Sequence, residues 1–488
     1  MIFLYLLIGI YTLGMLFIFI YSLAQGHLLL NFLGAKKALE QVPHVSPEVW
    51  PKVTVQLPIY NELYVVDRLI EAVSQMNYPS ELLEIQVLDD STDQTAELIQ
   101  KKIQEFPDIN FKYIHRADRS GFKAGALKEG LAKASGEFIA IFDADFVPDP
   151  GFLLKTIPYF SSAKVGMVQT RWTHLNKNYS LLTRLQAFAL DAHFLIEQIG
   201  RNSQHAFINF NGTGGIWRKS CIVDAGDWQD DTLTEDLDLS YRAQRKGWEF
   251  IYRPEIESPA ELPPIMSAVK SQQFRWTKGG AECAVKHAKA VLGENLPFST
   301  KFHAMAHLFN SSIFIAILLV SLSSIGVWWA GTQGMISANL FQVAGLFMIG
   351  FVIIACVYLV AYFYEKRSFW KSLIQAVYML PIFLSVSMGL ALHNAQAVWE
   401  GFSGKKSSFI RTPKFNLESG SGLATNRYIT FRIPATTWME GILMLVFSGM
   451  VGLQVYWETF EMLPFHLMLA IGYGLVFFSS FKAYSLSK

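Results

Sequence analysis

The chain has 488 residues, of which 51% are hydrophobic and 14% aromatic, and its formal net charge is +1. This composition is too apolar for an ordinary soluble enzyme and predicts several segments in a bilayer. The near-zero charge gives no electrostatic reason to expect a nucleic acid as a partner. The cysteines, Cys221, Cys283 and Cys356, are isolated, so neither a disulfide framework nor a cysteine metal site is predicted. A reduced, cytosolic catalytic domain is the simplest interpretation.

Residues 2–23 form an almost uninterrupted apolar run. The run is long enough to cross the hydrocarbon core of a membrane. It lacks the basic region and the small-residue cleavage site of a removable signal peptide. We therefore predict that residues 1–24 form a retained transmembrane anchor.

From Pro51 to about Ile256, short runs rich in β-branched and aromatic residues alternate with amphipathic helical patterns. Residues 65–76 and 95–106 are predicted helices, because their apolar side chains recur three and four positions apart. The alternation predicts an α/β domain over 50–262 with a mostly parallel sheet, whose ligands bind at the carboxyl ends of the strands. The predicted strands are 53–60, 84–90, 111–116, 137–145, 165–172 and 248–256.

Residues 303–488 are predicted to be a membrane region, and residues 263–302 are expected to form interfacial helices before it. A stretch at 372–393 is ambiguous, because it contains Pro381 and ends in the polar His393 and Asn394. Four other segments are long and apolar enough to cross a bilayer: 305–330, 341–363, 437–456 and 464–483.

Charge bias favours one membrane topology. The links 365–371 and 404–414 are basic and are expected on the cytoplasmic side, whereas 331–340 and 457–463 lack Lys and Arg. If both basic links lie on the cytoplasmic side, the segment 372–393 does not cross the bilayer. This arrangement gives five crossings and places the catalytic domain and the carboxyl terminus in the cytoplasm. The alternative is a sixth crossing that leaves one basic link outside.

Carboxylates follow two of the predicted strands. Asp143 and Asp145 end the fourth strand, and such a pair can hold a divalent cation that neutralises a diphosphate. Acidic pairs at loop starts are also often only solvated. Asp89 and Asp90 end the second strand, where one carboxylate can accept hydrogen bonds from a nucleobase or ribose. A turn before a capped helix explains the same residues, and both explanations can hold.

Two further motifs lie before the membrane region. The Thr-Glu-Asp sequence at 234–236 opens an amphipathic helix, where it caps the helix or supplies a general base for a sugar hydroxyl. Gln272, Arg275 and Trp276 share one helix face. They present an amide, a guanidinium suited to phosphate and an indole suited to stacking on a sugar. An interfacial helix with an aromatic anchor is compatible with the same pattern.

The order and spacing D, D-x-D, T-E-D and Q-x-x-R-W resemble the signature of processive family 2 inverting glycosyltransferases. This group contains the cellulose, mannan, chitin and hyaluronan synthases. The resemblance runs from Gln56 to about Lys414. The stretches QLPIYNE, VLDDSTD and VQTRW are most similar to the plant-type mannan and glucan backbone synthases, the cellulose synthase-like group, and to their bacterial relatives. The resemblance implies a GT-A-type, Rossmann-like catalytic domain.

The resemblance also implies roles for individual residues. Asp236 would be the catalytic base, in a motif that includes Glu235 and Thr234. Asp145 with Asp143 would bind Mg²⁺ or Mn²⁺. The residues that would bind the nucleotide, the diphosphate or the acceptor are Asp89, Asp90, Asp143, Lys123, Gln272, Arg275, Trp276, Phe210, Asn211 and Gly212.

The stretch FIRTPK at 409–414 resembles the F-x-V-T-x-K gating loop of cellulose synthases, and we expect a gating-type loop over 404–415. Such a loop would cover the active site from the cytoplasm, in agreement with the charge bias. Arg411 stands where the pattern has Val, and Phe415 where it has Gly. The substrate contacts expected from this loop are Thr412 and Lys414.

The predicted reaction is one in-line transfer of a hexose from UDP-glucose or GDP-mannose to a growing β-linked, β-1,4 polysaccharide acceptor. One displacement inverts the anomeric configuration. The membrane region would help to export the polymer. Aromatic side chains expected either to line that path or to lie at the membrane interface are Trp328, Trp329, Tyr358 and Tyr362.

Two other functions are compatible with the sequence. One is a non-processive transferase that adds a single sugar to a membrane lipid, as ceramide glucosyltransferase does. The other is a transporter or assembly scaffold with a degenerate catalytic domain, against which stand the intact acidic motifs. An accessory subunit is compatible with all of these functions. A bacterial inner membrane is favoured over a Golgi membrane because the termini are short.

Overall fold

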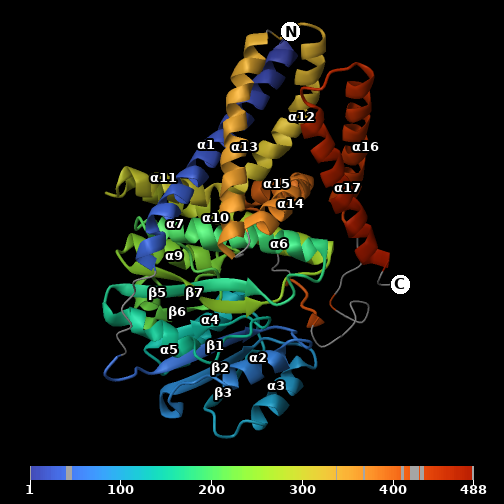
Figure 1. Ribbon diagram of the computed structural model, residues 1–488. Helices are drawn as coiled ribbons and strands as arrows, with labels where there is room; N and C mark the ends of the chain where they lie inside the picture. The colour runs from blue at the N-terminus through green and yellow to red at the C-terminus, as the bar shows by residue number, and fades with distance from the viewer. Residues whose placement is uncertain are drawn as a thin grey trace.

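The computed structural model describes residues 2–39, 47–336, 338–365, 369–407, 411–417, 428 and 433–485. An α/β domain lies at one end of the molecule and long helices extend from it at the other (Figure 1). A layer of helices that lie across the long axis separates the two parts. This order of parts is compatible with a catalytic domain, an interfacial layer and a membrane region, and that division stays a prediction.

The core of the α/β domain is a seven-stranded sheet of order β3-β2-β1-β4-β6-β5-β7. The neighbours β1–β2, β2–β3, β1–β4 and β5–β7 are parallel. Six of the strands match predicted ones, and β6 was not predicted. It runs antiparallel to both β4 and β5 and joins the two parallel groups. The strands are β1 (Val53–Ile59), β2 (Leu83–Asp89), β3 (Phe111–His115), β4 (Phe138–Ile141), β5 (Val165–His174), β6 (Gly215–Arg218) and β7 (Glu249–Ala260).

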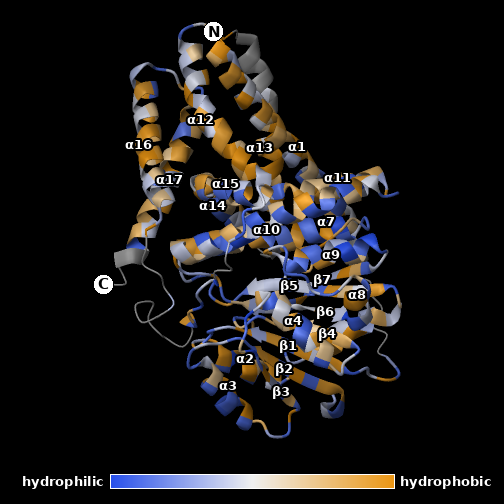
Figure 2. Cartoon of the chain, turned by 180° about the vertical axis from the view of Figure 1, so that it is seen from behind, coloured by the Kyte–Doolittle hydropathy of each residue, from blue (hydrophilic) through white to orange (hydrophobic). Residues whose placement is uncertain are grey.

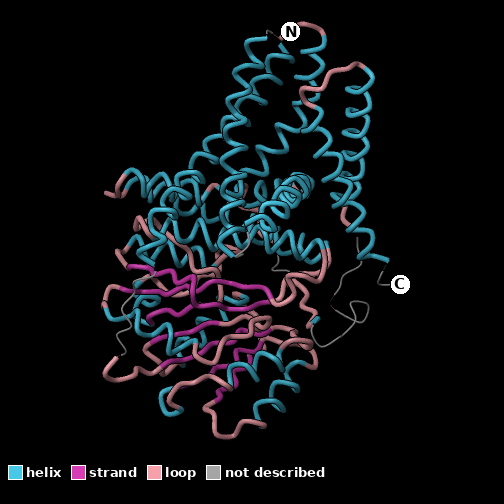
Figure 3. The backbone as a smooth tube through the Cα atoms, in the orientation of Figure 1, coloured by secondary structure: helices cyan, strands magenta, loops and turns pink. Residues whose placement is uncertain are grey.

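Helices cover both faces of the sheet, and Figure 3 shows the strands as one layer between them. Alternate residues of a strand point to opposite faces, so Val55 and Leu57 belong to one hydrophobic cluster while Leu88 and Ile141 belong to the other. The helices of this domain are α2 (Val66–Ser74), α3 (Thr95–Gln104), α4 (Phe122–Lys133), α5 (Phe152–Thr156), α6 (Leu181–Ala192), α7 (Gln198–Asn202), α8 (Lys219–Asp224) and α9 (Glu235–Arg245).

The N-terminal helix is longer than the predicted anchor. Helix α1 runs from Ile2 to Leu39, which is 38 residues and about 57 Å at 1.5 Å per residue. A hydrocarbon core of about 30 Å needs roughly 20 residues, so the second half of α1 extends beyond it. There the backbone of Leu28 lies against Gly200 of α7 and leaves no room for a Cβ. The expected boundary at residue 24 is therefore not an end of the helix.

Two helices form the interfacial layer and six more follow. Figure 2 shows that the upper helices are mostly hydrophobic, whereas α7, α9 and α10 carry many hydrophilic residues. In chain order these elements are α10 (Met266–Gly293), α11 (Phe298–Leu308), α12 (Ile313–Thr332), α13 (Ala338–Glu365), α14 (Phe369–Gly389), α15 (Ala391–Phe402), α16 (Ala435–Tyr456) and α17 (Leu463–Ser485).

Among the described residues, six helices are long and apolar enough to cross a membrane. They include α1, α12, α13, α16 and α17, as expected, and also α14. The ambiguous stretch at 372–393 contains a break at Leu390, because α14 stops at Gly389 and α15 starts at Ala391. Length and composition thus permit α14 to cross, and its course relative to the bilayer stays a prediction.

Helix α14 is held tightly against α17. The backbones of Gly389 in α14 and Gly472 in α17 approach so closely that neither position has room for a Cβ. Small residues allow such close helix contacts in membranes. The contact explains how a helix that contains Pro381 keeps a defined place in the bundle.

Candidate active site

The predicted motifs converge on one cavity at the carboxyl ends of β1, β2 and β4. Segments that are far apart in the sequence, from β2 to the loop after α15, contribute to its wall. All but two of the predicted site residues line it: Asp90, Lys123, Asp143, Asp145, Asn211, Gly212, Thr234, Glu235, Asp236, Gln272, Arg275, Trp276, Thr412 and Lys414. The carboxylates and the Q-x-x-R-W motif therefore face a common space.

Asp89 and Phe210 do not line this cavity, contrary to our expectation of substrate contacts. The Asp89 carboxylate is fully buried and accepts hydrogen bonds from the Tyr113 hydroxyl at 2.7 Å and from the Ser91 amide at 2.9 Å. Phe210 is also fully buried and packs edge-on against Trp217. Their neighbours in the sequence, Asp90 and Asn211, do line the cavity. Asp89 and Phe210 therefore support the cavity wall from the core.

The Asp143–Asp145 pair is approached by two ammonium groups. Lys123 donates to Asp143 Oδ1 at 2.7 Å and to the carbonyl of Gly212 at 2.9 Å. Lys414 contacts Asp145 Oδ1 at 2.6 Å. Burial alone would raise the pKa of Asp143, but the charges of Lys123 and Lys414 hold that pKa below its usual value. The Asp143 carboxylate is thus an ionised acceptor.

The donor set fits a hard divalent cation only in part. No group of three or more His, Cys, Asp or Glu side chains suitable for a metal occurs in the described part of the chain. Mg²⁺ is commonly held by one or two carboxylates, with the remaining positions filled by phosphate oxygens and water. The pair Asp143 and Asp145 fits that kind of shared coordination.

The T-E-D motif places two carboxylates at the first turn of α9. Glu235 and Asp236 are close together, and burial followed by the charge of Glu235 raises the pKa of Asp236 to about 7. A carboxylate with a pKa near neutrality suits a general base. Thr234 occupies the N-cap position, but its hydroxyl lies 3.4 Å from Cys283 Sγ and does not cap the helix.

The Q-x-x-R-W residues lie on α10, one face of which borders the cavity, as predicted. Gln272, Arg275 and Trp276 all line it. Burial lowers the pKa of the Arg275 guanidinium, against the raising influence of the nearby acidic groups. Its Nη2 donates to the Thr412 hydroxyl at 3.2 Å, so the loop after α15 contacts this helix directly.

Glu62 and Arg411 are among the residues that line the cavity but were not predicted to act in the site. Glu62 follows β1, and its Oε2 lies 2.7 Å from Nη1 of Arg411. Arg411 also lies over the ring of Tyr428, at 4.1 Å from the centroid. Glu62 lies in the stretch QLPIYNE, which is part of the family resemblance. That resemblance was the signal in the sequence that could have identified Glu62 as a site residue. Phe409 and Ile410 of the expected gating loop lie outside the described residues.

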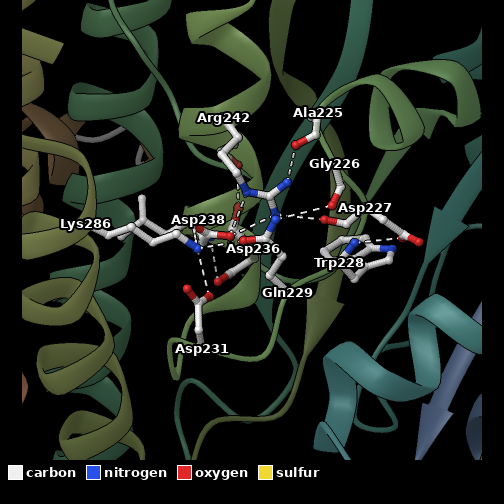
Figure 4. Close-up of polar contacts among 12 residues, drawn as sticks. Ala225, Gly226, Asp227, Trp228, Gln229, Asp231, Asp236, Asp238, Arg242 and Lys286 are labelled. Carbon is white, nitrogen blue, oxygen red and sulfur yellow. Dashed lines mark hydrogen bonds and ion pairs between the residues drawn. The ribbon is translucent and has the colours of Figure 1, made fainter. Parts of the chain in front are cut away.

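A charged cluster behind the cavity joins α9 to α10 (Figure 4). The Asp238 carboxylate is fully buried and accepts from Arg242 Nε at 2.9 Å, Lys286 Nζ at 2.7 Å and His287 Nε2 at 2.8 Å. Burial opposes ionisation, but these partners hold the pKa of Asp238 well below its usual value. Arg242 Nη2 also donates to the carbonyl of Asp227 at 2.8 Å. The helix with the T-E-D motif is thereby fixed to the helix with Q-x-x-R-W.

A second cavity of about 480 Å³ adjoins the first. The two share Asn211, Asp236 and Trp276. From these residues the second cavity extends between α1, α12, α13 and α14, where Tyr21 and Tyr358 line it. Its volume lies in the range of ligand sites in proteins.

Of the four aromatics expected either along an export path or at the membrane interface, only Tyr358 borders this second cavity. Trp328 instead stacks on Trp457 with ring centroids 5.3 Å apart, and its Nε1 donates to the Thr459 hydroxyl at 3.0 Å. Trp329 is exposed. Tyr362 packs against Phe188. These three residues pack between helices or lie on the outer surface.

Residues 51–279 match the model of the family described as "Glycosyltransferase like family 2". A probable glucomannan 4-beta-mannosyltransferase 2 of Oryza sativa subsp. japonica is 42% identical over 290 residues, which are 58% of this chain and 50% of that protein. Glucomannan 4-beta-mannosyltransferase 1 of Cyamopsis tetragonoloba is 43% identical over 262 residues, 52% of this chain and 50% of that protein. The chain thus spans about half the length of the curated relatives it matches.

A solved structure confirms the fold. The mannosyltransferase PcManGT from Pyrobaculum calidifontis, in complex with GDP-Man and Mn²⁺, superposes with a TM-score of 0.53 at 18% identity, over 80% of this chain and 100% of that chain. The predicted GT-A-type α/β fold and the predicted resemblance to family 2 and to cellulose synthase-like mannan synthases are therefore confirmed.

Proposed function

Residues 51–279 form a family 2 glycosyltransferase domain, and from this premise we propose that the protein is a membrane-embedded inverting hexosyltransferase that extends a β-1,4-linked polysaccharide. One observation carries the proposal. Asp90, Asp145, Asp236 and Trp276 face a single cavity, and that cavity adjoins a second one among the membrane helices. One continuous space would thus hold the donor, the base and the path of the product.

GDP-mannose is the favoured donor, with UDP-glucose as the alternative. The favoured choice follows the relatives, whose names describe mannosyl transfer to glucomannan. Asp90 borders the cavity, and its carboxylate is paired with Arg116 through Nε at 2.7 Å and Nη2 at 2.5 Å. The pair places a rigid polar group at the carboxyl end of β2, where the nucleoside would bind.

The transfer would proceed by one displacement at the anomeric carbon. Asp236 takes the proton of the acceptor hydroxyl as that oxygen attacks, and the configuration inverts in the single step. Lys123 and Arg275 stabilise the negative charge that develops on the leaving diphosphate. Asp143 and Asp145 would hold Mg²⁺ or Mn²⁺, which supplies further neutralisation of the diphosphate.

The loop at 411–417 would close the donor site. Lys414 contacts Asp145, and Arg411 contacts Glu62. Because Lys414 occupies an oxygen that a cation would need, metal binding requires this ammonium to move away. A donor diphosphate offers Lys414 new anionic oxygens within the same cavity, so loop closure and donor binding would be coupled.

The second cavity would receive the growing chain. Sugar hydroxyls are costly to bury in hydrocarbon without hydrogen-bond partners. This cavity offers polar side chains such as Tyr21 and Gln25 of α1 and Ser387 of α14. A polymer could therefore leave the site between the membrane helices, with the catalytic domain on the cytoplasmic side of a bacterial inner membrane or a Golgi membrane.

Product analysis tests the proposal. The purified protein in lipid vesicles receives GDP-mannose or UDP-glucose with a radiolabelled sugar, together with Mg²⁺ or Mn²⁺. The expected product is a polymer that an endo-β-1,4-mannanase degrades. A lipid-extractable monosaccharide conjugate would support the single-sugar transferase instead. Failure of the protein to release nucleotide from either donor would support the scaffold.

A further inference from the structure

A π-helical turn, η3, lies beside the second cavity. It spans His193–Glu197 between α6 and α7, and the amide of Gln198 donates to the carbonyl of His193. Such turns insert one extra residue into a helix and are frequent at functional sites. Both His193 and Glu197 line the cavity. Their imidazole and carboxylate are joined through Nδ1 and Oε2 at 3.0 Å.

Glu197 is a fixed, ionised acceptor at the centre of a buried network. Gln25 of α1 donates to its Oε1 at 2.9 Å, and Arg201 donates to its Oε2 at 2.5 Å. Burial alone would raise the pKa of Glu197, but Arg201 and His193 lower it to about 2. An ionised carboxylate accepts only, and so does the amide oxygen of Asn211 that faces Nε2. This geometry therefore places a proton on both ring nitrogens of His193, and each donates to one of the two oxygens.

The other ring nitrogen of His193 determines how Asn211 is oriented. His193 Nε2 lies 3.2 Å from Asn211 Oδ1, and Asn209 Nδ2 donates to the same oxygen at 2.9 Å. Turning the Asn211 amide over would bring its NH₂ group against the NH₂ group of Asn209. The amide oxygen of Asn211 therefore faces His193 and Asn209.

The amide nitrogen of Asn211 remains available. Within the described residues, Asn211 Nδ2 has no hydrogen-bond partner, and it is buried. Asn211 lines both cavities, as do Asp236 and Trp276. The next residue, Gly212, is so close to Asp236 that a Cβ there would lie 3.0 Å from Oδ2. An unpartnered donor thus sits beside the general base.

We propose that His193 is a positioning residue for the acceptor sugar. Held by Glu197, it orients Asn211 so that Nδ2 donates a hydrogen bond to an oxygen of the sugar unit whose hydroxyl Asp236 deprotonates. This inference rests on the proposed polysaccharide synthase function and names the part of the site that selects a carbohydrate acceptor. It also links the position of α1, through Gln25, to acceptor binding.

Two matched variants test this role in the full-length protein in lipid nanodiscs. His193→Asn replaces the imidazole by a side chain too short to join Glu197 and Asn211. His205→Asn makes the same exchange at an exposed histidine with positive φ, which asparagine tolerates. The measurements are the KM for β-1,4-mannotetraose and the Kd for GDP. His193→Asn is expected to raise the acceptor KM about tenfold, the effect of one lost hydrogen bond, with the Kd for GDP unchanged.

A third variant supplies a rescue. His193→Gln has an amide that reaches Asn211, so its acceptor KM is expected to lie between those of the wild type and His193→Asn. Three results would overturn the role of His193: an acceptor KM that is unchanged in His193→Asn, an equal loss of GDP binding, or an equal effect of His205→Asn.

Direct binding separates this inference from the proposed function. Mannotetraose binding to the GDP-loaded wild-type protein is measured by calorimetry without turnover. If the wild type binds the oligosaccharide and His193→Asn does not, the positioning role holds even where no polymer forms. If the wild type forms polymer and both proteins bind the oligosaccharide equally, the positioning role fails while the proposed function stands.

Discussion

Asp236 and Glu235 show how neighbouring side chains set the chemistry of one residue. Both carboxylates are withdrawn from water, which raises the pKa of each, and the charge of Glu235 further raises the pKa of Asp236. The charge of Lys123, whose Nζ lies 3.8 Å from Glu235 Oε1, lowers the pKa of Asp236. The result is a pair in which Asp236 has a pKa of about 7, a value that allows it to take a proton at neutral pH and to release it afterwards.

The rate of transfer should depend on pH through Asp236. Its pKa of about 7 is raised from the usual value, so the fraction in the basic, deprotonated form falls about tenfold per pH unit below 7. The rate is expected to rise with pH up to about 7 and then to level off. Initial rates at saturating donor between pH 5 and 9 measure this, and a flat profile in that range would contradict the role of Asp236.

Replacing the base should separate binding from turnover. Asp236→Asn keeps the size of the side chain but removes its ability to accept a proton, and a general base typically contributes 10²–10⁴-fold to a rate. We expect a loss of activity of that order with GDP affinity retained. Radiolabel incorporation and GDP titration measure the two quantities. Asp224→Asn, an exposed carboxylate on α8, is the matched control and should behave as the wild type.

At the scale of elements, the site depends on how α9, α10 and the loop at 411–417 are held together. Asp238 connects α9 to α10 in the core. On the other side of the cavity, Asn416 and Leu417 of the loop donate backbone hydrogen bonds to Glu261, at 2.9 Å each. Asp236 on α9 and Arg275 on α10 are therefore held in one unit, and the loop at 411–417 is fixed against the domain by polar contacts.

Breaking the link between α9 and α10 should destabilise the domain. Asp238→Asn leaves Arg242, Lys286 and His287 without the buried charge that they surround, and removal of one partner from a buried ion pair typically costs about 3–5 kcal/mol. A fall of several degrees in Tm is expected, measured by thermal unfolding in detergent. A Tm equal to that of Asp224→Asn would show that the cluster does not stabilise the domain.

For the whole molecule, the arrangement of the helices agrees with the membrane topology that charge bias favours. The α12–α13 and α16–α17 connections lie at the end opposite the sheet (Figure 1). The basic segment after α15 instead reaches the catalytic cavity, since Arg411 and Lys414 contact Glu62 and Asp145. The α/β domain, the interfacial layer and that loop thus belong to one side of the bilayer in the proposed arrangement.

Cysteine labelling tests that topology. Exposed positions are changed singly to cysteine, Gln333→Cys, Lys371→Cys and Lys406→Cys, in a protein whose exposed Cys356 is replaced by serine. With a membrane-impermeant maleimide on sealed vesicles, Lys371→Cys and Lys406→Cys are expected to react from the side of the catalytic domain, and Gln333→Cys from the other side. Reaction of Lys371→Cys and Lys406→Cys from opposite sides would mean that α14 crosses the membrane.

Much of the domain was predictable from local pattern. Six of the seven strands and the helices α2 and α3 follow from the spacing of apolar residues, because that spacing depends only on the geometry of a strand or helix. The acidic motifs and Q-x-x-R-W also kept their expected positions, since the carboxyl ends of parallel strands meet at one edge of a sheet. The sequence by itself therefore determined the fold class, the membrane region and the neighbourhood of the site.

The tertiary structure alone decided which side chains meet. Strand β6 has only four residues, too few to show a period, and it exists because β4 and β5 offer it hydrogen bonds on both sides. Asp89 and Asp90 are adjacent in the sequence, yet one is in the core and the other faces the cavity. The pairing of Lys414 with Asp145 and of His193 with Asn211 joins distant segments. Such contacts depend on how whole helices, strands and loops pack against one another. The spacing of residues along the chain holds no information about that packing.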